Sequence, residues 1–150
     1  MGLDPPRDEA FRWRWVGDFV VQMFSEGEVD KTAWSTFIAD LHGSRARVRG
    51  VLTLTHGGGP DAPQRSALRT VLDDGPPLPA AILTDSRMAR VCVAALNLFL
   101  KPEARPRLFA PHRLDDAFEY LRMSPSLRPE CRTAISEMER ELGIERRVSA

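Results

Sequence analysis

Hydrophobic and basic residues alternate in FRWRWV, Phe11 to Val16, which places the phenylalanine and both tryptophans on one face of a β-strand. The next two residues, Gly17-Asp18, are typical of a tight turn. FVVQMF, Phe19 to Phe24, then continues with the β-branched and aromatic residues that strands prefer. The pattern predicts an antiparallel hairpin.

Beyond this hairpin, segments with helical spacing alternate with short apolar segments. The helical segments begin near Asp30, Pro63, Asp85-Ser86 and His112 and end near Gly43, Leu72, Leu100 and Leu121. The apolar segments fit buried strands at Val48 to Thr55, Pro79 to Thr84 and Arg105 to Pro111. Strands that are joined by single helices run parallel in one sheet. The predicted fold class is therefore α/β, a mixed sheet with an N-terminal antiparallel hairpin followed by parallel strands alternating with helices.

The helix that starts at Asp85-Ser86 has an unusually wide apolar surface. Its main stripe is widened by three further apolar residues, and together these are Met88, Val91, Cys92, Val93, Ala94, Ala95, Leu96, Leu98 and Phe99. Such a broad surface predicts that the helix is buried on more than one side.

An extra helix is predicted at the C-terminal end, from Ser126 to Leu142. Its apolar residues recur at i, i+3, i+4, i+7 and i+11, and Gly143 ends it. We expect this apolar stripe to pack against a sheet, either that of the same chain or that of a partner subunit. In the second case the helix would form the interface of a homodimer. The predicted organisation is a flexible N-terminus at 1–10, an α/β domain at 11–123, and a C-terminal helix and tail at 124–150.

Length and composition favour one globular domain. A chain of 150 residues with 43% hydrophobic residues is long enough for a single core. No apolar run reaches the ~18 residues of a membrane span, and MGLDPPRDEAF does not resemble an export signal, so we expect a cytoplasmic protein. Cys92 and Cys131 fall on apolar helix faces, which favours reduced core cysteines.

Charge and motifs exclude several function classes. The chain has 21 basic and 21 acidic residues, and its densest basic run, RARVR at Arg45 to Arg49, is interpreted as solvated charge beside a strand, so nucleic acid is not an expected partner. The three histidines lack metal-ligand spacing, and no phosphate-binding GK[ST] loop follows the triple glycine. No cofactor and no metal are expected.

Polar residues follow three of the predicted parallel strands. These residues are His56, Asp85-Ser86 and His112, and the Gly57, Gly58 and Gly59 run comes directly after the first of them. Ligands of open parallel sheets gather at the edge where the strands end, close to helix N-termini. The sequence therefore predicts one shallow binding rim at this edge, in which the glycine N–H groups could also hold an anion.

A hydrolase hypothesis would use the same rim. Ser86 would be the nucleophile, a histidine the base, and the amides of Gly57 to Gly59 an oxyanion hole. The chain has no GxSxG nucleophile motif, and TDSRM around Ser86 lacks the glycines of that turn. Simpler roles explain the same residues, because Asp85 and Ser86 are favoured helix caps and three glycines let a chain turn sharply out of a strand.

Two segments, AAILTDSRMARVCVAALNLFL and RLFAPHRLDDAFEYL, together with this order of elements, resemble the SpoIIAA-like group of STAS-type domains. In that group a strand ends in a polar pair, a helix with an Ala-Arg start packs on the sheet, and a final strand leads into a Leu-Asp-x-Ala helix. The corresponding positions here are Asp85-Ser86, Ala89-Arg90, and Leu114, Asp115 and Ala117. The resemblance spans about Phe11 to Leu121.

The resemblance implies a bacterial regulatory protein that works in signalling or assembly by protein–protein binding, without catalysis. STAS proteins that antagonise anti-sigma factors are phosphorylated on a serine in the turn after the strand that corresponds to VLTLT. This chain has His56-Gly57-Gly58-Gly59 there, with Thr55 and Ser66 as the flanking hydroxyls. The phosphorylation switch therefore does not carry over with the family, whereas partner binding does.

We expect the chain to bind another protein through nine residues at the rim and at the start of the following helix, namely His56, Gly57, Gly58, Gly59, Asp85, Ser86, Arg87, Arg90 and His112. The alternative is a module that binds a small apolar or anionic ligand, with Met88 to Leu100 lining the cavity. A small hydrolase is the third hypothesis.

Overall fold

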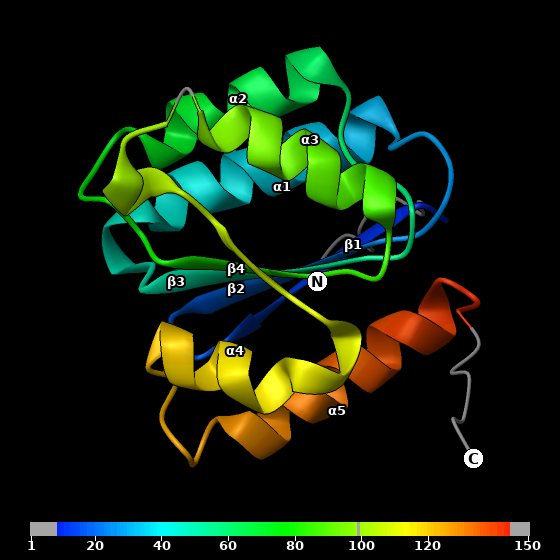
Figure 1. The fold of residues 1–150 in the computed structure, drawn as a ribbon, viewed down its shortest axis with the longest axis vertical. Coiled ribbons are helices and arrows are strands. Elements are labelled where there is room, and N and C mark those ends of the chain that lie inside the picture. The colour runs from blue at the N-terminus through cyan, green and yellow to red at the C-terminus, as the bar shows by residue number, and fades with distance from the viewer. Residues whose placement is uncertain (1–8, 99, 145–150) are drawn as a thin grey trace, which may run out of the picture.

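The computed structural model describes residues 9–98 and 100–144 and has two helical layers around one sheet (Figure 1). The strands are β1 (Phe11–Val16), β2 (Phe19–Phe24), β3 (Gly50–Thr55), β4 (Ala80–Leu83) and β5 (Arg107–Phe109). The α-helices are α1 (Lys31–Ser44), α2 (Ala62–Leu72), α3 (Arg87–Asn97), α4 (Leu114–Leu121) and α5 (Arg128–Glu141). Short 3-10 helices occupy η1 (Arg45–Arg47), η2 (Pro102–Ala104) and η3 (Pro111–Arg113).

The five strands lie in the order β1-β2-β3-β4-β5, so each strand pairs with its neighbour in sequence. β1 and β2 are antiparallel, and every later pair is parallel. The predicted fold class is therefore confirmed. Each connection from β2 to β3, β3 to β4 and β4 to β5 moves one position along the sheet in the same direction. Because such parallel connections are right-handed, their helices lie on the same face of the sheet. Figure 1 shows α1, α2 and α3 on that face and α4 and α5 on the other.

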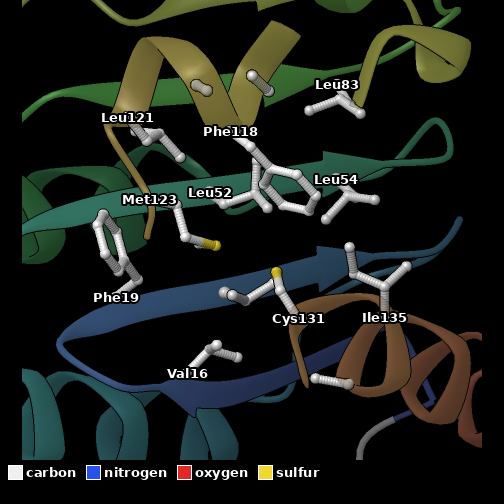
Figure 2. Packing of buried hydrophobic residues seen from close by; sticks show 14 of the residues in the cluster. Val16, Phe19, Leu52, Leu54, Leu83, Phe118, Leu121, Met123, Cys131 and Ile135 are labelled. Carbon is white, nitrogen blue, oxygen red and sulfur yellow. The ribbon is translucent and has the colours of Figure 1, made fainter. Parts of the chain in front are cut away.

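The alternation of side chains in β2 divides the core into two parts. Val20 and Phe24 point toward α1, where they pack with the aromatic residues of β1 and α1. On the other face the strand contributes to a cluster under α4 and α5 (Figure 2). This cluster contains Val16, Phe19, Val21, Met23, Leu52, Leu54, Phe118, Leu121, Met123, Cys131, Ile135 and Met138, among others.

The apolar stripe of α5 is buried against the sheet of its own chain. Cys131, Ala134, Ile135 and Met138 are all buried in the cluster of Figure 2. Burial raises the pKa of the Cys131 thiol to about 12, which is consistent with the predicted inert core cysteine. A dimer through α5 remains a prediction, and it would have to use the outer face of this helix.

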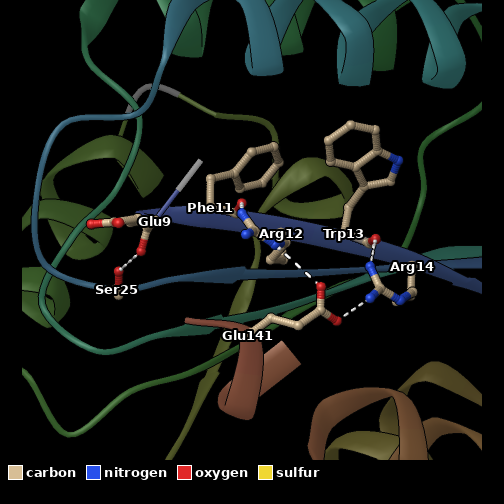
Figure 3. A network of polar contacts seen from close by, with 7 residues as sticks. All are labelled: Glu9, Phe11, Arg12, Trp13, Arg14, Ser25 and Glu141. Atoms are coloured by element: carbon tan, nitrogen blue, oxygen red, sulfur yellow. Dashed lines mark hydrogen bonds and ion pairs between the residues drawn. The ribbon is translucent and has the colours of Figure 1, made fainter. Parts of the chain in front are cut away.

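Side chains on the two faces of β1 connect it to both helical layers. The indole Nε1 atoms of Trp13 and Trp15 both donate to Asp40 Oδ2 of α1, over 3.1 Å and 2.8 Å. On the opposite face, Arg12 and Arg14 both pair with Glu141 of α5 (Figure 3). The predicted alternation of FRWRWV is confirmed, and each face of the strand has its own acidic partner.

Two local predictions around α1 are wrong. Gly43 lies inside the helix, which continues to Ser44 and into η1, so it is not the stop. Arg45 is buried, because its guanidinium donates to the carbonyl oxygens of Leu72 and Pro76, which lie at and just beyond the end of α2. Arg47 and Arg49 are exposed, so the solvated character predicted for RARVR holds for those two only.

The ends of the chain fall partly outside the described residues. The predicted flexible N-terminus and C-terminal tail concern mainly residues 1–8 and 145–150, which lie outside them. Within the described part, Glu9 and Ala10 are tied to β2, since their carbonyl oxygens accept hydrogen bonds from Ser25. Among residues 9–98 and 100–144, no helix has both the length and the apolar character that crossing a bilayer requires.

Candidate binding surfaces

The predicted rim residues share one edge of the sheet. Because β3, β4 and β5 are adjacent and parallel, the residues that follow them come together there, and we call this side the carboxyl edge. His56, Asp85 and His112 are all exposed at this edge. Within the described part of the chain, no hydrogen bond joins any two of them. These residues follow neighbouring strands at one edge, as predicted, but their side chains are not hydrogen-bonded to one another as the members of a catalytic site would be.

The triple glycine is a backbone bend with a steric reason. Gly57 has φ +109°, a conformation that side chains disfavour. A Cβ atom at Gly58 would overlap the Ser25 carbonyl oxygen, so the two chain segments can approach only through glycine. Thr55 Oγ1 closes the bend by donating to the Gly58 carbonyl oxygen over 2.6 Å. These contacts account for two of the three glycines without a substrate.

Ser86 has a capping role. Its hydroxyl oxygen accepts a hydrogen bond from the Ala89 backbone N–H over 3.2 Å, in the first turn of α3. Its own N–H donates to Thr84 Oγ1 over 3.0 Å. No described histidine contacts this hydroxyl, so the structure does not assemble the serine–histidine pair that the hydrolase hypothesis needs.

Two of the predicted residues, His56 and Arg90, line different pockets. His56 lines one pocket together with the end of α5 and three glutamates; its residues are Glu9, Ser25, Glu26, His56, Arg140, Glu141, Leu142, Gly143 and Ile144. Arg90 lines the other, beside β5, with Arg107, Leu108, Phe109, Ala110, Arg113, Asp116, Glu119 and Tyr120. His56 follows Leu54 on the α4–α5 face by strand alternation, which separates it from α3. His56 and Arg90 therefore do not share a pocket, and the other predicted residues line neither of these two.

The pocket beside β5 contains residues that are not among the predicted site residues. The guanidinium carbon of Arg107 lies 5.5 Å and 5.4 Å from the ring centroids of Phe109 and Tyr120. Alternation in RPRLFAP could have placed Arg107 and Phe109 on one face. The contribution of Tyr120 could not be predicted, because it depends on how α4 returns across the sheet.

The predicted burial of α3 on more than one side is wrong. None of its described side chains is buried, and Met88, Val91 and Leu98, the residue just after the helix, have exposed fractions of 72%, 64% and 79%. Cys92 is also exposed, contrary to the prediction of a core cysteine. Ala89 and Val93, on the inner side, are half-buried. The helix follows a four-residue strand and precedes a three-residue strand, so the sheet offers little surface for it to cover.

Metal chemistry has no support among the described residues, where no group of three or more His, Cys, Asp or Glu side chains could hold an ion. Comparison of the chain with models of known protein families, with curated proteins and with solved structures gives no match. The most distinctive surface of this fold is the outer face of α3, with its exposed apolar side chains.

Proposed function

We propose that the chain is a non-enzymatic regulatory or assembly protein of the STAS or SpoIIAA-like type that acts by binding another protein through α3. The order of a hairpin followed by alternating helices and strands supports this family, as do the segments AAILTDSRMARVCVAALNLFL and RLFAPHRLDDAFEYL. The outer face of α3 consists of Met88, Val91, Cys92 and Ala95, and together with Leu98, which directly follows the helix, we call it the α3 face.

The exposure of the α3 face is the observation that carries this proposal. Its three largest side chains are more than 60% exposed, although they lie at the helical spacing of a core-facing stripe. Burying one such side chain contributes about 1.5–3 kcal/mol, so leaving three in water is unfavourable unless another molecule covers them. An exposed helix face is convex, and a partner protein can bury it. A small ligand instead binds in a concave site that encloses it.

Charge around the α3 face favours a partner with an acidic rim. The helix carries Arg87 and Arg90, both exposed, and has no acidic residue from Ser86 to Leu100. Charged residues at the border of an interface affect orientation and association rate more than affinity. The expected partner surface is therefore apolar at its centre and acidic at its border.

A single charge at the centre of the α3 face tests the proposal. Immobilised wild-type chain, Val91→Glu and Ala39→Glu are incubated with lysate of the source cells, and the captured proteins are quantified by mass spectrometry. Ala39 is exposed on α1, so its variant adds the same charge to the same face of the sheet outside the α3 face. A partner should be captured by the wild type and by Ala39→Glu, and at least about tenfold less by Val91→Glu, since burying an unpaired carboxylate costs more than ~1.4 kcal/mol.

Capture that is equal for all three chains would contradict the role of α3. Because both substitutions are at exposed positions, each should change the free energy of unfolding by less than about 0.5 kcal/mol. Thermal unfolding of the three chains checks this, so that a loss of capture is not confused with a loss of fold. Replacing Arg87 and Arg90 with Glu should weaken the capture of the same partner without unfolding the domain.

Small-ligand binding is a second candidate because of one buried polar atom. Gln22 is only 4% exposed, and its Nε2 donates to Thr53 Oγ1 over 2.7 Å, but no described group donates to its Oε1. An unpaired buried acceptor is costly, so a bound molecule with a donor would satisfy it, as would an internal water. Native mass spectrometry of protein purified from its own cells separates the two, since only a ligand adds a stoichiometric mass beyond that of water.

A further inference from the structure

The pocket beside β5 lies along the free edge of the sheet. β5 is the last strand in the order, so one of its sides has no neighbouring strand. The pocket has a volume of about 670 Å³ and lies between Arg90 of α3 on one face and Asp116, Glu119 and Tyr120 of α4 on the other. We call it the β5-edge pocket. It shares only Arg90 with the helix that carries the α3 face.

The backbone of β5 presents hydrogen-bonding groups to this pocket. Thr84 N–H donates to the Phe109 carbonyl oxygen over 3.1 Å, so Phe109 directs its backbone groups toward β4. In a strand, successive residues direct these groups to opposite sides, and Leu108 therefore points its N–H and C=O toward the free edge. Pro106 has no N–H, so pairing cannot extend far beyond Leu108 in that direction. The edge suits a short extended segment rather than a long strand.

The charge of the β5-edge pocket is not balanced internally. Three of its charged groups are engaged locally, since Arg113 pairs with Asp116 over 2.6 Å and Glu119 pairs with Arg128, outside the pocket lining, over 3.2 Å. Arg90 and Arg107 have no ion pair with any described carboxylate. Arg107 is exposed and rests over two aromatic rings, which orients its guanidinium without neutralising it. Two guanidinium groups, one on each face of the sheet edge, are thus without a described carboxylate partner, although Arg90 also donates to the Thr84 carbonyl oxygen over 3.4 Å.

We propose that the β5-edge pocket binds a short, extended, acidic segment of a partner polypeptide, which adds to the sheet as a strand beside β5. Its backbone pairs with Leu108, and its carboxylates, from side chains or the C-terminus, bind Arg107 on the α4 face of the sheet and Arg90 on the α3 face. Strand addition to a sheet edge and capture of a carboxylate are both established modes of peptide recognition. This site does not depend on the α3 face or on the family assignment.

A second copy of the chain fits the pocket less well. Two β5 strands paired around Leu108 would bring Arg105 and Arg107 of both copies to one edge, and like charges close together are destabilising. An acidic segment has the opposite charge. Charge complementarity therefore favours a partner polypeptide as the occupant.

A library of random heptapeptides displayed on phage with free C-termini is the probe. Selection on the wild-type chain should enrich peptides with Asp or Glu, and one enriched peptide is then synthesised with a fluorescent label and titrated by anisotropy. Leu108→Pro removes the outward N–H, which an edge strand tolerates because that N–H does not pair with β4. Leu108→Ala is the matched control, since it loses the side chain but keeps the N–H.

The expected result is binding that is at least tenfold weaker for Leu108→Pro than for Leu108→Ala, and similarly weakened by Arg107→Gln. Val91→Glu should bind the peptide as the wild type does, which separates this site from the α3 face. The inference is overturned if no acidic peptide is enriched, or if Leu108→Pro and Leu108→Ala bind equally. It is also overturned if sedimentation shows a wild-type dimer that Leu108→Pro dissociates, because the occupant is then a second copy. Circular dichroism confirms that each variant is folded.

Discussion

Gly58 illustrates how a motif that suggests chemistry can be explained by close packing. It lies against the carbonyl oxygen of Ser25, at the point where β3 ends beside β2. Gly57, the residue before it, has a positive φ, whereas Gly59, the residue after it, has open space around its Cα. The three glycines therefore have unequal roles, which a catalytic explanation of the motif would not predict.

The unequal roles give a direct prediction. Gly58→Ala should lower the free energy of unfolding by at least about 1–3 kcal/mol, because the new methyl group forces the Ser25 segment to move. Gly59→Ala is the matched control and should be neutral or stabilising by up to about 1 kcal/mol, since alanine reduces the freedom of the unfolded chain. Denaturant unfolding measures both. Equal effects of the two substitutions would show that the bend does not depend on the Ser25 contact.

Among the secondary-structure elements, β1 is bound by two acidic side chains, one from the helices on each face of the sheet. Asp40 of α1 accepts from both tryptophans in a half-buried position, whereas Glu141 of α5 pairs with two arginines close to solvent. Hydrogen bonds to a charged acceptor contribute about 1.5–3 kcal/mol, and exposed ion pairs about 0–1 kcal/mol. The two carboxylates connect the same strand to its neighbours, but with different strength.

Asp40→Ala should therefore destabilise the protein more than Glu141→Ala does. We expect a loss of about 1.5–3 kcal/mol for Asp40→Ala, which leaves two indole N–H groups unpaired, and less than about 1 kcal/mol for Glu141→Ala. Denaturant unfolding followed by tryptophan fluorescence measures both, and high salt should reduce only the smaller effect. An equal loss for both variants would contradict this assignment.

The elements also show what the sequence could and could not predict. The period of FRWRWV and the stripe of α5 follow from patterns within single segments, and the parallel strands follow from the alternation of helices and strands; all are confirmed. The exposure of α3 could not be predicted, because its apolar pattern is that of a buried helix and only the short strands beside it leave it uncovered. The pockets that His56 and Arg90 line depend on the placement of α5 and α4, which no local pattern contains.

At the scale of the whole molecule, the two faces of the sheet are covered unequally. α4 and α5 enclose the cluster of Figure 2. In it, Phe118, Cys131 and Met138 have no measurable exposure. On the opposite face, α3 leaves Met88, Val91 and Leu98 in water. A protein that works alone gains nothing from this asymmetry, whereas one that binds a partner keeps an apolar surface for it.

The reactivity of the two cysteines toward an alkylating reagent tests this difference between the two faces in one experiment. Cys92 is exposed on the α3 face, and Cys131 is buried with its pKa raised by burial, so only the first should react with an alkylating reagent in the folded chain. The reagent is applied to purified protein and to intact source cells, and mass spectrometry follows each cysteine. The account predicts rapid alkylation of Cys92 in the purified chain, clearly slower alkylation in cells, where a partner covers α3, and an unreactive Cys131 in both. Equally rapid alkylation of Cys92 in both samples, or a Cys92 that is already protected in the purified chain, would contradict it.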